Sequence, residues 1–208
     1  MTRKPPGQQQ ITFRQELARK GTHMFALVIP GGYYLLGLTR WEALSILIPI
    51  TIAMILIDIA RLRGWAFWRK FAVRIIGPMI RQHEQGGDFT GATYILLSTC
   101  LTIGFYDKLI AIAALAFIIV GDSFAALIGR KFGRHHFRTK TLEGSLGCLV
   151  GTLLVAWLIP GLNIWLGVIG AVVATVVEAV SFDIDDNVSV PIVSGLVMHL
   201  LARIVTFS

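Results

Sequence analysis

Long apolar stretches separated by short polar segments run through the whole chain. A helix needs about 17–25 mostly apolar residues to cross the hydrocarbon core of a bilayer. By this criterion the pattern predicts seven spans, at 23–39, 41–60, 91–106, 108–129, 144–160, 163–182 and 188–207. The first and third are short, and Pro30-Gly31-Gly32 interrupts the first. We therefore expect an all-α fold, a polytopic membrane helix bundle of about seven transmembrane helices.

The composition also indicates a membrane protein. Of the 208 residues, 55% are hydrophobic and 15% are charged, whereas about 25% of the residues in a soluble domain are charged. Residues 1–10 contain two prolines, a glycine and three glutamines, so we expect a disordered N-terminal tail there. Residues 11–208 are expected to form a single transmembrane catalytic domain. Cys100 and Cys148 lie in apolar runs and are interpreted as packing residues.

The basic residues predict the orientation of the bundle. Sixteen of the 19 lysines and arginines lie in the N-terminal arm, in segment 61–90 or in segment 130–143. With seven spans these segments share one face, which the positive-inside rule places in the cytoplasm. We expect a multi-pass protein of the cell (inner) membrane, with its N-terminus and active site cytoplasmic. The net charge of +7 then needs no nucleic-acid partner to explain it.

Segment 61–90 has the pattern of an interfacial amphipathic helix. Basic residues fall on one helical stripe, at Arg63, Lys70, Arg74 and Arg81. Aromatic and apolar residues fall on another, at Trp65, Trp68, Ala72, Ile75 and Met79. A helix of this kind lies in the headgroup region with its apolar face toward the acyl chains. Its apolar face is expected to be an anchor without a chemical role.

Asp122 is an ionisable residue inside a predicted span. Such a residue costs roughly 2.5–3.5 kcal/mol on insertion scales and is a functional candidate for that reason. Gly121, Ala125 and Gly129 recur around it at four-residue spacing, a small-residue face that lets another helix approach closely. A structural hydrogen bond between spans is the alternative. Function is favoured because a basic, glycine-containing loop follows directly.

That loop, GRKFGRHHFRTKTLEGS, begins at Gly129. Clustered cations, glycines that permit close backbone approach and a helix start after Thr141 are typical of a polyphosphate site. The alternative is a solvated charge cluster that only sets topology. Glu143, a lone acid among cations, favours a placed partner or a metal ligand. His135 and His136 are expected to be incidental loop residues, since no further Cys or His lies at zinc-ligand spacing.

A second polar cluster follows the sixth predicted span. It contains Glu178, Asp183, Asp185, Asp186 and Asn187. Oxygen-rich clusters favour Mg²⁺, held by one or two carboxylates together with phosphate oxygens. The alternative is a helix cap, because Asp186 or Asn187 could serve as the N-cap of the last span. For Asp183 and Asp185 these two interpretations remain equally open.

Several of these segments together resemble the motifs of the membrane polyprenol kinase family. This family comprises dolichol kinases, phytol kinases and CTP-dependent diacylglycerol kinases. Three motifs carry the main resemblance, at Gly121–Arg134, Lys140–Ser145 and Asp186–Pro191. Arg19-Lys20 with His23, and Arg81 with Glu84 and Gly91-Ala92-Thr93, resemble further elements of the family. The match extends from about residue 16 onward, with the motifs in the family's order.

The resemblance implies transfer of the γ-phosphoryl group of a nucleoside triphosphate, CTP in the family, to the hydroxyl of a membrane lipid alcohol. Diacylglycerol, phytol and polyprenols are the candidate acceptors, and Mg²⁺ is the expected cofactor. Asp122 would hold the metal or accept the hydroxyl proton, Lys140 would bind phosphate, and His23 would lie where the lipid hydroxyl arrives. The expected nucleotide-binding residues are Arg19, Lys20, Gly129, Arg130, Lys131, Gly133, Thr141 and Gly144. The expected metal or metal-orienting residues are Asp122, Glu143, Glu178, Asp186 and Asn187.

Two other functions remain in view. Phosphatidate cytidylyltransferases share a version of the Asp…Gly-Arg…Gly and Lys-Thr-x-Glu-Gly motifs. Their C-terminal segment carries a Gly-His pair, which DIDDNVSVP lacks, and this departure favours the kinase. A transporter that uses Asp122 as an ion site should show paired broken helices. The chain has no counterpart of Pro30-Gly31-Gly32 in its second half.

Overall fold

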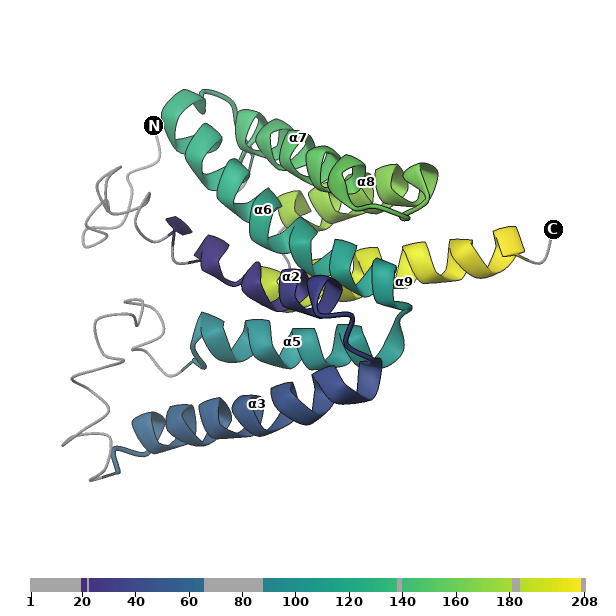
Figure 1. The fold of residues 1–208 in the computed structure, drawn as a ribbon. Coiled ribbons are helices and arrows are strands. Elements are labelled where there is room, and N and C mark those ends of the chain that lie inside the picture. The colour runs from purple at the N-terminus through teal and green to yellow at the C-terminus, as the bar shows by residue number, and fades with distance from the viewer. Residues whose placement is uncertain (1–19, 22, 66–87, 138–139, 181–183, 207–208) are drawn as a thin grey trace, which may run out of the picture.

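The computed structural model describes residues 20–206 except 22, 66–87, 138–139 and 181–183. The described chain is helical apart from a short hairpin (Figure 1). The helices are α2 (Val28–Leu35), α3 (Arg40–Leu62), α5 (Gly91–Phe105), α6 (Lys108–Phe132), α7 (Leu142–Leu158), α8 (Ile164–Val180) and α9 (Asp186–Thr206). The hairpin pairs β1 (His136–Phe137) with β2 (Lys140–Thr141) in antiparallel register. The all-α class is therefore confirmed, and the two-residue strands are an addition to it.

Helix α6 is the central element of the bundle. It packs against α2, α5, α7, α8 and α9, and Figure 1 shows it crossing the middle of the structure. Its N-terminal half is enclosed on all sides, and Ala111, Ala113, Ala114 and Phe117 have no exposed surface. The alanines in this half allow neighbouring helices to approach closely, while Phe117 fills the space that remains. The helix thus holds Asp122 at a fixed position within the bundle.

Helices α6 and α7 meet along their small residues. A Cβ atom built on Gly121 would lie 2.9 Å from Cys148 Sγ, and one built on Gly129 would lie 3.2 Å from Gly144 Cα. The first distance is shorter than a Cβ atom makes without a shift of its neighbour, and the second is tighter than most Cβ contacts, so glycine at both positions favours this close separation. The predicted close approach of another helix to the Gly121–Gly129 face is confirmed. It brings the motif on α6 against the motif that begins α7.

Helices α3 and α5 form a pair that a buried carboxylate joins. Asp58 is 1% exposed, and its Oδ2 accepts hydrogen bonds from Thr90 N at 2.8 Å, Thr90 Oγ1 at 3.0 Å and Thr93 Oγ1 at 2.7 Å. Its Oδ1 accepts from Arg61 Nε at 3.2 Å, and Arg61 also donates to the carbonyl of Asp88. One carboxylate therefore fastens the end of α3 to the beginning of α5.

The number of crossings is established only in part. Among the described residues, α3, α6 and α9 are long and apolar enough to span a membrane, whereas α5, α7 and α8 are shorter apolar helices. Helix α2 has eight residues, or about 12 Å at 1.5 Å per residue, which is too short to cross alone. Seven crossings remain a prediction. The predicted amphipathic helix falls mostly on 66–87, and the predicted tail on 1–10, so both lie outside the described residues.

The expected interruption at Pro30-Gly31-Gly32 is wrong. These residues lie inside α2, and the chain turns before it, at 26–27. Pro30 is the third residue of the helix. The first N–H groups of a helix have no partner within the helix, so the missing N–H of a proline costs nothing there.

Candidate active site

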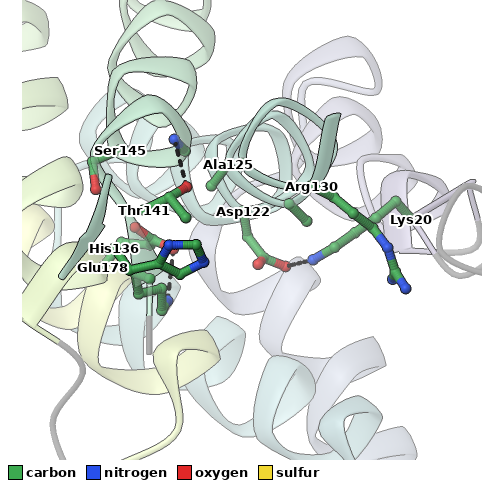
Figure 2. A pocket seen from close by; sticks show the side chains of 12 residues that line it. Lys20, Asp122, Ala125, Arg130, His136, Thr141, Ser145 and Glu178 are labelled. Carbon is green, nitrogen blue, oxygen red and sulfur yellow. Dashed lines mark hydrogen bonds and ion pairs between the residues drawn. The ribbon is translucent and has the colours of Figure 1, made fainter. Parts of the chain in front are cut away.

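A cavity of about 300 Å³ opens where α6, the hairpin and the start of α7 meet. Figure 2 shows side chains from distant parts of the chain directed into it. Its lining consists of Lys20, Asp122, Ala125, Ala126, Gly129, Arg130, His136, Lys140, Thr141, Gly144, Ser145 and Glu178. Three motifs noted in the sequence thus contribute to one cavity with anionic and cationic walls.

Asp122 forms an ion pair at one wall of the cavity. Lys20 Nζ donates a hydrogen bond to Asp122 Oδ2 (Figure 2), and His23 Nε2 lies 3.4 Å from the same oxygen. The Lys20 side chain is 3% exposed, and that of Asp122 is 23% exposed. The structure therefore brings together three residues that were selected from the sequence, two of them about 100 positions from the third. The carboxylate is matched by cationic or hydrogen-bonding groups rather than left uncompensated.

Lys140 forms a second ion-pair cluster at another wall. Its Nζ donates to Glu178 Oε1 at 2.6 Å and to Asp186 Oδ2 at 2.8 Å. Burial acts to lower the pKa of Lys140, but the charge of Glu178 and the hydrogen bond to Asp186 outweigh it and raise this pKa above its usual value. Lys140 is therefore an ammonium group at neutral pH. A single cation thereby connects β2 to α8 and α9.

Comparison with known proteins identifies the family. CTP-dependent diacylglycerol kinase 1 of Saccharomyces cerevisiae is 26% identical over 91% of this chain and 74% of its own length. An uncharacterized protein of Rickettsia prowazekii is 30% identical over 86% of this chain and 91% of its own. The phytol kinase of a Synechocystis species is 31% identical over 58% of each chain. The chain belongs to the membrane polyprenol kinase family. No family model and no solved structure matches it.

The polyprenol kinase motif Lys140–Ser145 begins a helix at the cavity. Thr141 is the N-cap of α7, and its Oγ1 accepts from Gly144 N at 3.1 Å. The first turn of α7 therefore presents backbone N–H groups beside the cavity, an arrangement that favours anions. Gly144 packs against Gly129 across the α6–α7 contact, so these two glycines serve helix packing as well as lining the cavity.

The other expected nucleotide-binding residues are placed differently. Arg130 lines the cavity, whereas Lys131 is exposed and its Nζ lies 5.1 Å from the ring centroid of Phe132. Gly133 is the C-cap of α6, and its N–H donates to Gly129 O at 2.9 Å. Arg19 lies outside the described residues. The predicted set is thus divided between cavity-lining and flanking positions.

The expected metal-binding residues do not all converge. Glu178 and Asp186 share Lys140. Glu143 Oε1 lies 2.7 Å from His135 Nδ1, and Asn187 donates from N and Nδ2 to Asp185 Oδ1. Glu143 therefore shapes the turn before the hairpin, and Asn187 orients a neighbouring acid. In the part of the chain that the structure describes, no group of three or more His, Cys, Asp or Glu side chains is arranged to hold a metal.

The arrangement of Glu178 and Asp186 fits Mg²⁺ held by two protein ligands rather than by three or more. Glu178 Oε1 and Asp186 Oδ2 converge on one point, where the ammonium group of Lys140 lies. Mg²⁺ is commonly held by one or two carboxylates, with phosphate oxygens and water completing the coordination. These two oxygens are the protein ligands that such an ion would use.

Sequence reasoning missed three features of the structure. His136 lines the cavity, although its sequence context made it an incidental loop residue. Asp58 is an ionisable residue in a predicted span, as Asp122 is, and the same argument could have found it. Ser145 also lines the cavity and lies at the end of a family motif.

Proposed function

We propose that this protein is a CTP-dependent lipid kinase. It transfers the γ-phosphoryl group of CTP to the hydroxyl of a membrane lipid alcohol, such as diacylglycerol, phytol or a polyprenol. The observation that carries the proposal is the meeting of Lys20–Asp122 and Lys140–Glu178–Asp186 at a cavity beside the α7 N-terminus. The names of the relatives, which are diacylglycerol and phytol kinases, support the choice of nucleotide and acceptor.

Phosphoryl transfer depends mainly on positioning and charge neutralisation. In the proposed reaction Lys20, Lys140 and Arg130, together with the first turn of α7, bind the triphosphate. Mg²⁺, which Glu178 and Asp186 would hold, would supply further neutralisation of phosphate charge. Bound phosphates draw Lys140 away from these carboxylates. Each of these groups already lines the cavity or bonds to a residue that does.

The acceptor hydroxyl reaches the cavity beside His23 and Asp122. Its oxygen forms a bond to the γ-phosphorus, the bond from that phosphorus to the bridging oxygen breaks, and CDP leaves. The hydroxyl proton passes to the carboxylate of Asp122. Because the transition state of phosphoryl transfer is loose, this proton moves late, and a carboxylate paired with Lys20 is a sufficient base.

Replacing Asp122 with Asn tests the proposal. The substitution keeps the shape of the side chain and removes its charge, so we expect lipid phosphorylation to fall at least 100-fold, a usual effect of removing an acid or base. Asp107→Asn is the matched control, because Asp107 precedes the opposite end of α6 and is 65% exposed. Near-wild-type turnover by Asp122→Asn would remove the basis of the mechanism.

Labelled CTP separates the kinase from a cytidylyltransferase. Purified protein is incubated with a panel of lipid alcohols and phosphatidate, and with CTP labelled at either the α or the γ phosphorus. A kinase places only the γ label on a lipid alcohol. Transfer of the α label to phosphatidate, with release of pyrophosphate, would instead establish a cytidylyltransferase.

A further inference from the structure

The hairpin places an aromatic ring at the rim of the cavity. His136 pairs directly with Thr141 across the two strands, and directly opposed residues of an antiparallel pair place their side chains on the same face. Both residues line the cavity, and Figure 2 shows the His136 ring on the Thr141 side, directed into the cavity. His136 is exposed, so its ring lies at the opening rather than at the floor.

The chemistry of the lining distinguishes this ring from its neighbours. Lys20, Arg130 and Lys140 are cations suited to phosphate. Among the described residues that line the cavity, His136 has the only aromatic ring. A nucleobase is uncharged at neutral pH and presents flat faces, which stack on aromatic rings with little dependence on the base. The lining therefore has separate groups for the two parts of a nucleotide.

We infer that His136 is a nucleotide-contacting residue whose imidazole ring stacks on the base, while the lysines and the α7 N-terminus bind the triphosphate. This inference rests on the proposed use of a nucleoside triphosphate and adds a residue to it. Its geometry follows from the hairpin, because the base lies at the exposed rim and the phosphates extend inward toward Asp122 and Lys140. Phe137, the next residue on β1, alternates to the other face of the strand, is 53% exposed and is not among the described lining residues.

Direct nucleotide binding tests the inference. Equilibrium dialysis of the purified full chain with labelled CTP and Mg²⁺, without lipid, measures the dissociation constant. We expect His136→Ala to weaken binding about 5- to 10-fold, the lower part of the range for base–aromatic stacking, because imidazole is a small ring. His136→Phe retains a stacking ring and should bind within about twofold of wild type, while His136→Lys places a cation there without a ring and should stay weak. Phe137→Ala is the matched control and should bind as wild type does.

Competition by inorganic triphosphate separates a base contact from a phosphate contact or a general distortion. Triphosphate has no base, so its affinity should be the same for wild type and His136→Ala. Equal loss of CTP and triphosphate affinity would overturn the inference, as would rescue by His136→Lys without rescue by His136→Phe. Unchanged CTP affinity in His136→Ala would overturn it as well.

The outcome also distinguishes this inference from the proposed function. If His136→Ala weakens CTP binding but no γ label reaches a lipid, the base contact stands and the kinase proposal fails. If lipid phosphorylation is robust and His136→Ala binds CTP normally, the base contact alone fails. A wild-type chain that binds no nucleotide would overturn both.

Discussion

Lys140 has both a structural and a proposed chemical role, and a pair of substitutions separates them. Its Nζ bonds to Glu178 Oε1 at 2.6 Å and to Asp186 Oδ2 at 2.8 Å. Lys140→Met removes the charge and keeps most of the chain length. The two carboxylates then face each other without the Lys140 ammonium group between them, and the side chain of Glu178 is only 3% exposed.

The magnitude follows from Coulomb's law. Two oxygens bound to one nitrogen lie within about 5 Å of each other, and unit charges at that separation repel by about 3 kcal/mol at an effective dielectric of 20. We therefore expect Lys140→Met to lower the free energy of unfolding by about 3 kcal/mol. In the proposed reaction Lys140 stabilises the transferring phosphoryl group, so its loss should also lower turnover by about 10²- to 10³-fold.

The double variant Lys140→Met with Glu178→Gln separates these two effects. A neutral glutamine removes the repulsion, so most of the lost stability should return, while turnover should stay low because the ammonium group of residue 140 is still missing. Unfolding in a denaturing-detergent titration measures the first quantity, and lipid phosphorylation with γ-labelled CTP measures the second. If Lys140→Met kept wild-type stability, or if the double variant regained full turnover, the assigned roles of Lys140 would be refuted.

Two further predictions concern the scaffold around the site. Asp58→Ala removes the buried carboxylate that accepts from Arg61, Thr90 and Thr93 and should lower the free energy of unfolding by about 3–5 kcal/mol; a loss below 1 kcal/mol in the same titration would contradict the role given to Asp58. Gly129→Ala places a Cβ 2.7 Å from Thr141 Oγ1 and should cost about 1–3 kcal/mol. Gly104→Ala in α5 meets nothing within 4 Å and should stabilise by about 0.5–1 kcal/mol. Equal stabilities of these two alanine variants would refute the close α6–α7 contact.

The helices were predictable because apolar runs are a local property of the sequence. The expected span 41–60 lies within α3 at Arg40–Leu62, and 108–129 lies within α6 at Lys108–Phe132. The N-cap at Thr141 was also evident locally, since threonine is a preferred N-cap residue and an apolar run follows it. Pro30 misled the interpretation because its effect depends on its position in the helix, and the sequence does not show where α2 begins.

The contacts within the site were less accessible from sequence. Asp122 was selected because a charged residue in an apolar span has a free-energy cost. Lys140 was selected because it lies in a cationic, glycine-containing loop of the kind that binds phosphate. Both signals can be read from the neighbouring sequence alone. Their partners are distant, since Lys20 lies 102 positions before Asp122 and Glu178 lies 38 positions after Lys140. The position of His136 depends on two-residue strands, which are too short to produce an alternating pattern. Only the folded chain shows that this ring lies beside the cavity.

The paired lysines give the site a distinctive electrostatic property. Lys20 pairs with Asp122, and Lys140 pairs with both Glu178 and Asp186, so two ammonium groups face three carboxylates at the site. In the proposed reaction a triphosphate attracts both ammonium groups and leaves the carboxylates exposed to one another. Buried charges without partners are costly, so phosphate binding by the lysines and cation binding by Glu178 and Asp186 favour each other. A polyanion and a divalent cation are then accepted together more readily than either is accepted alone, which is the requirement for a site that transfers phosphoryl groups from a magnesium–nucleotide complex.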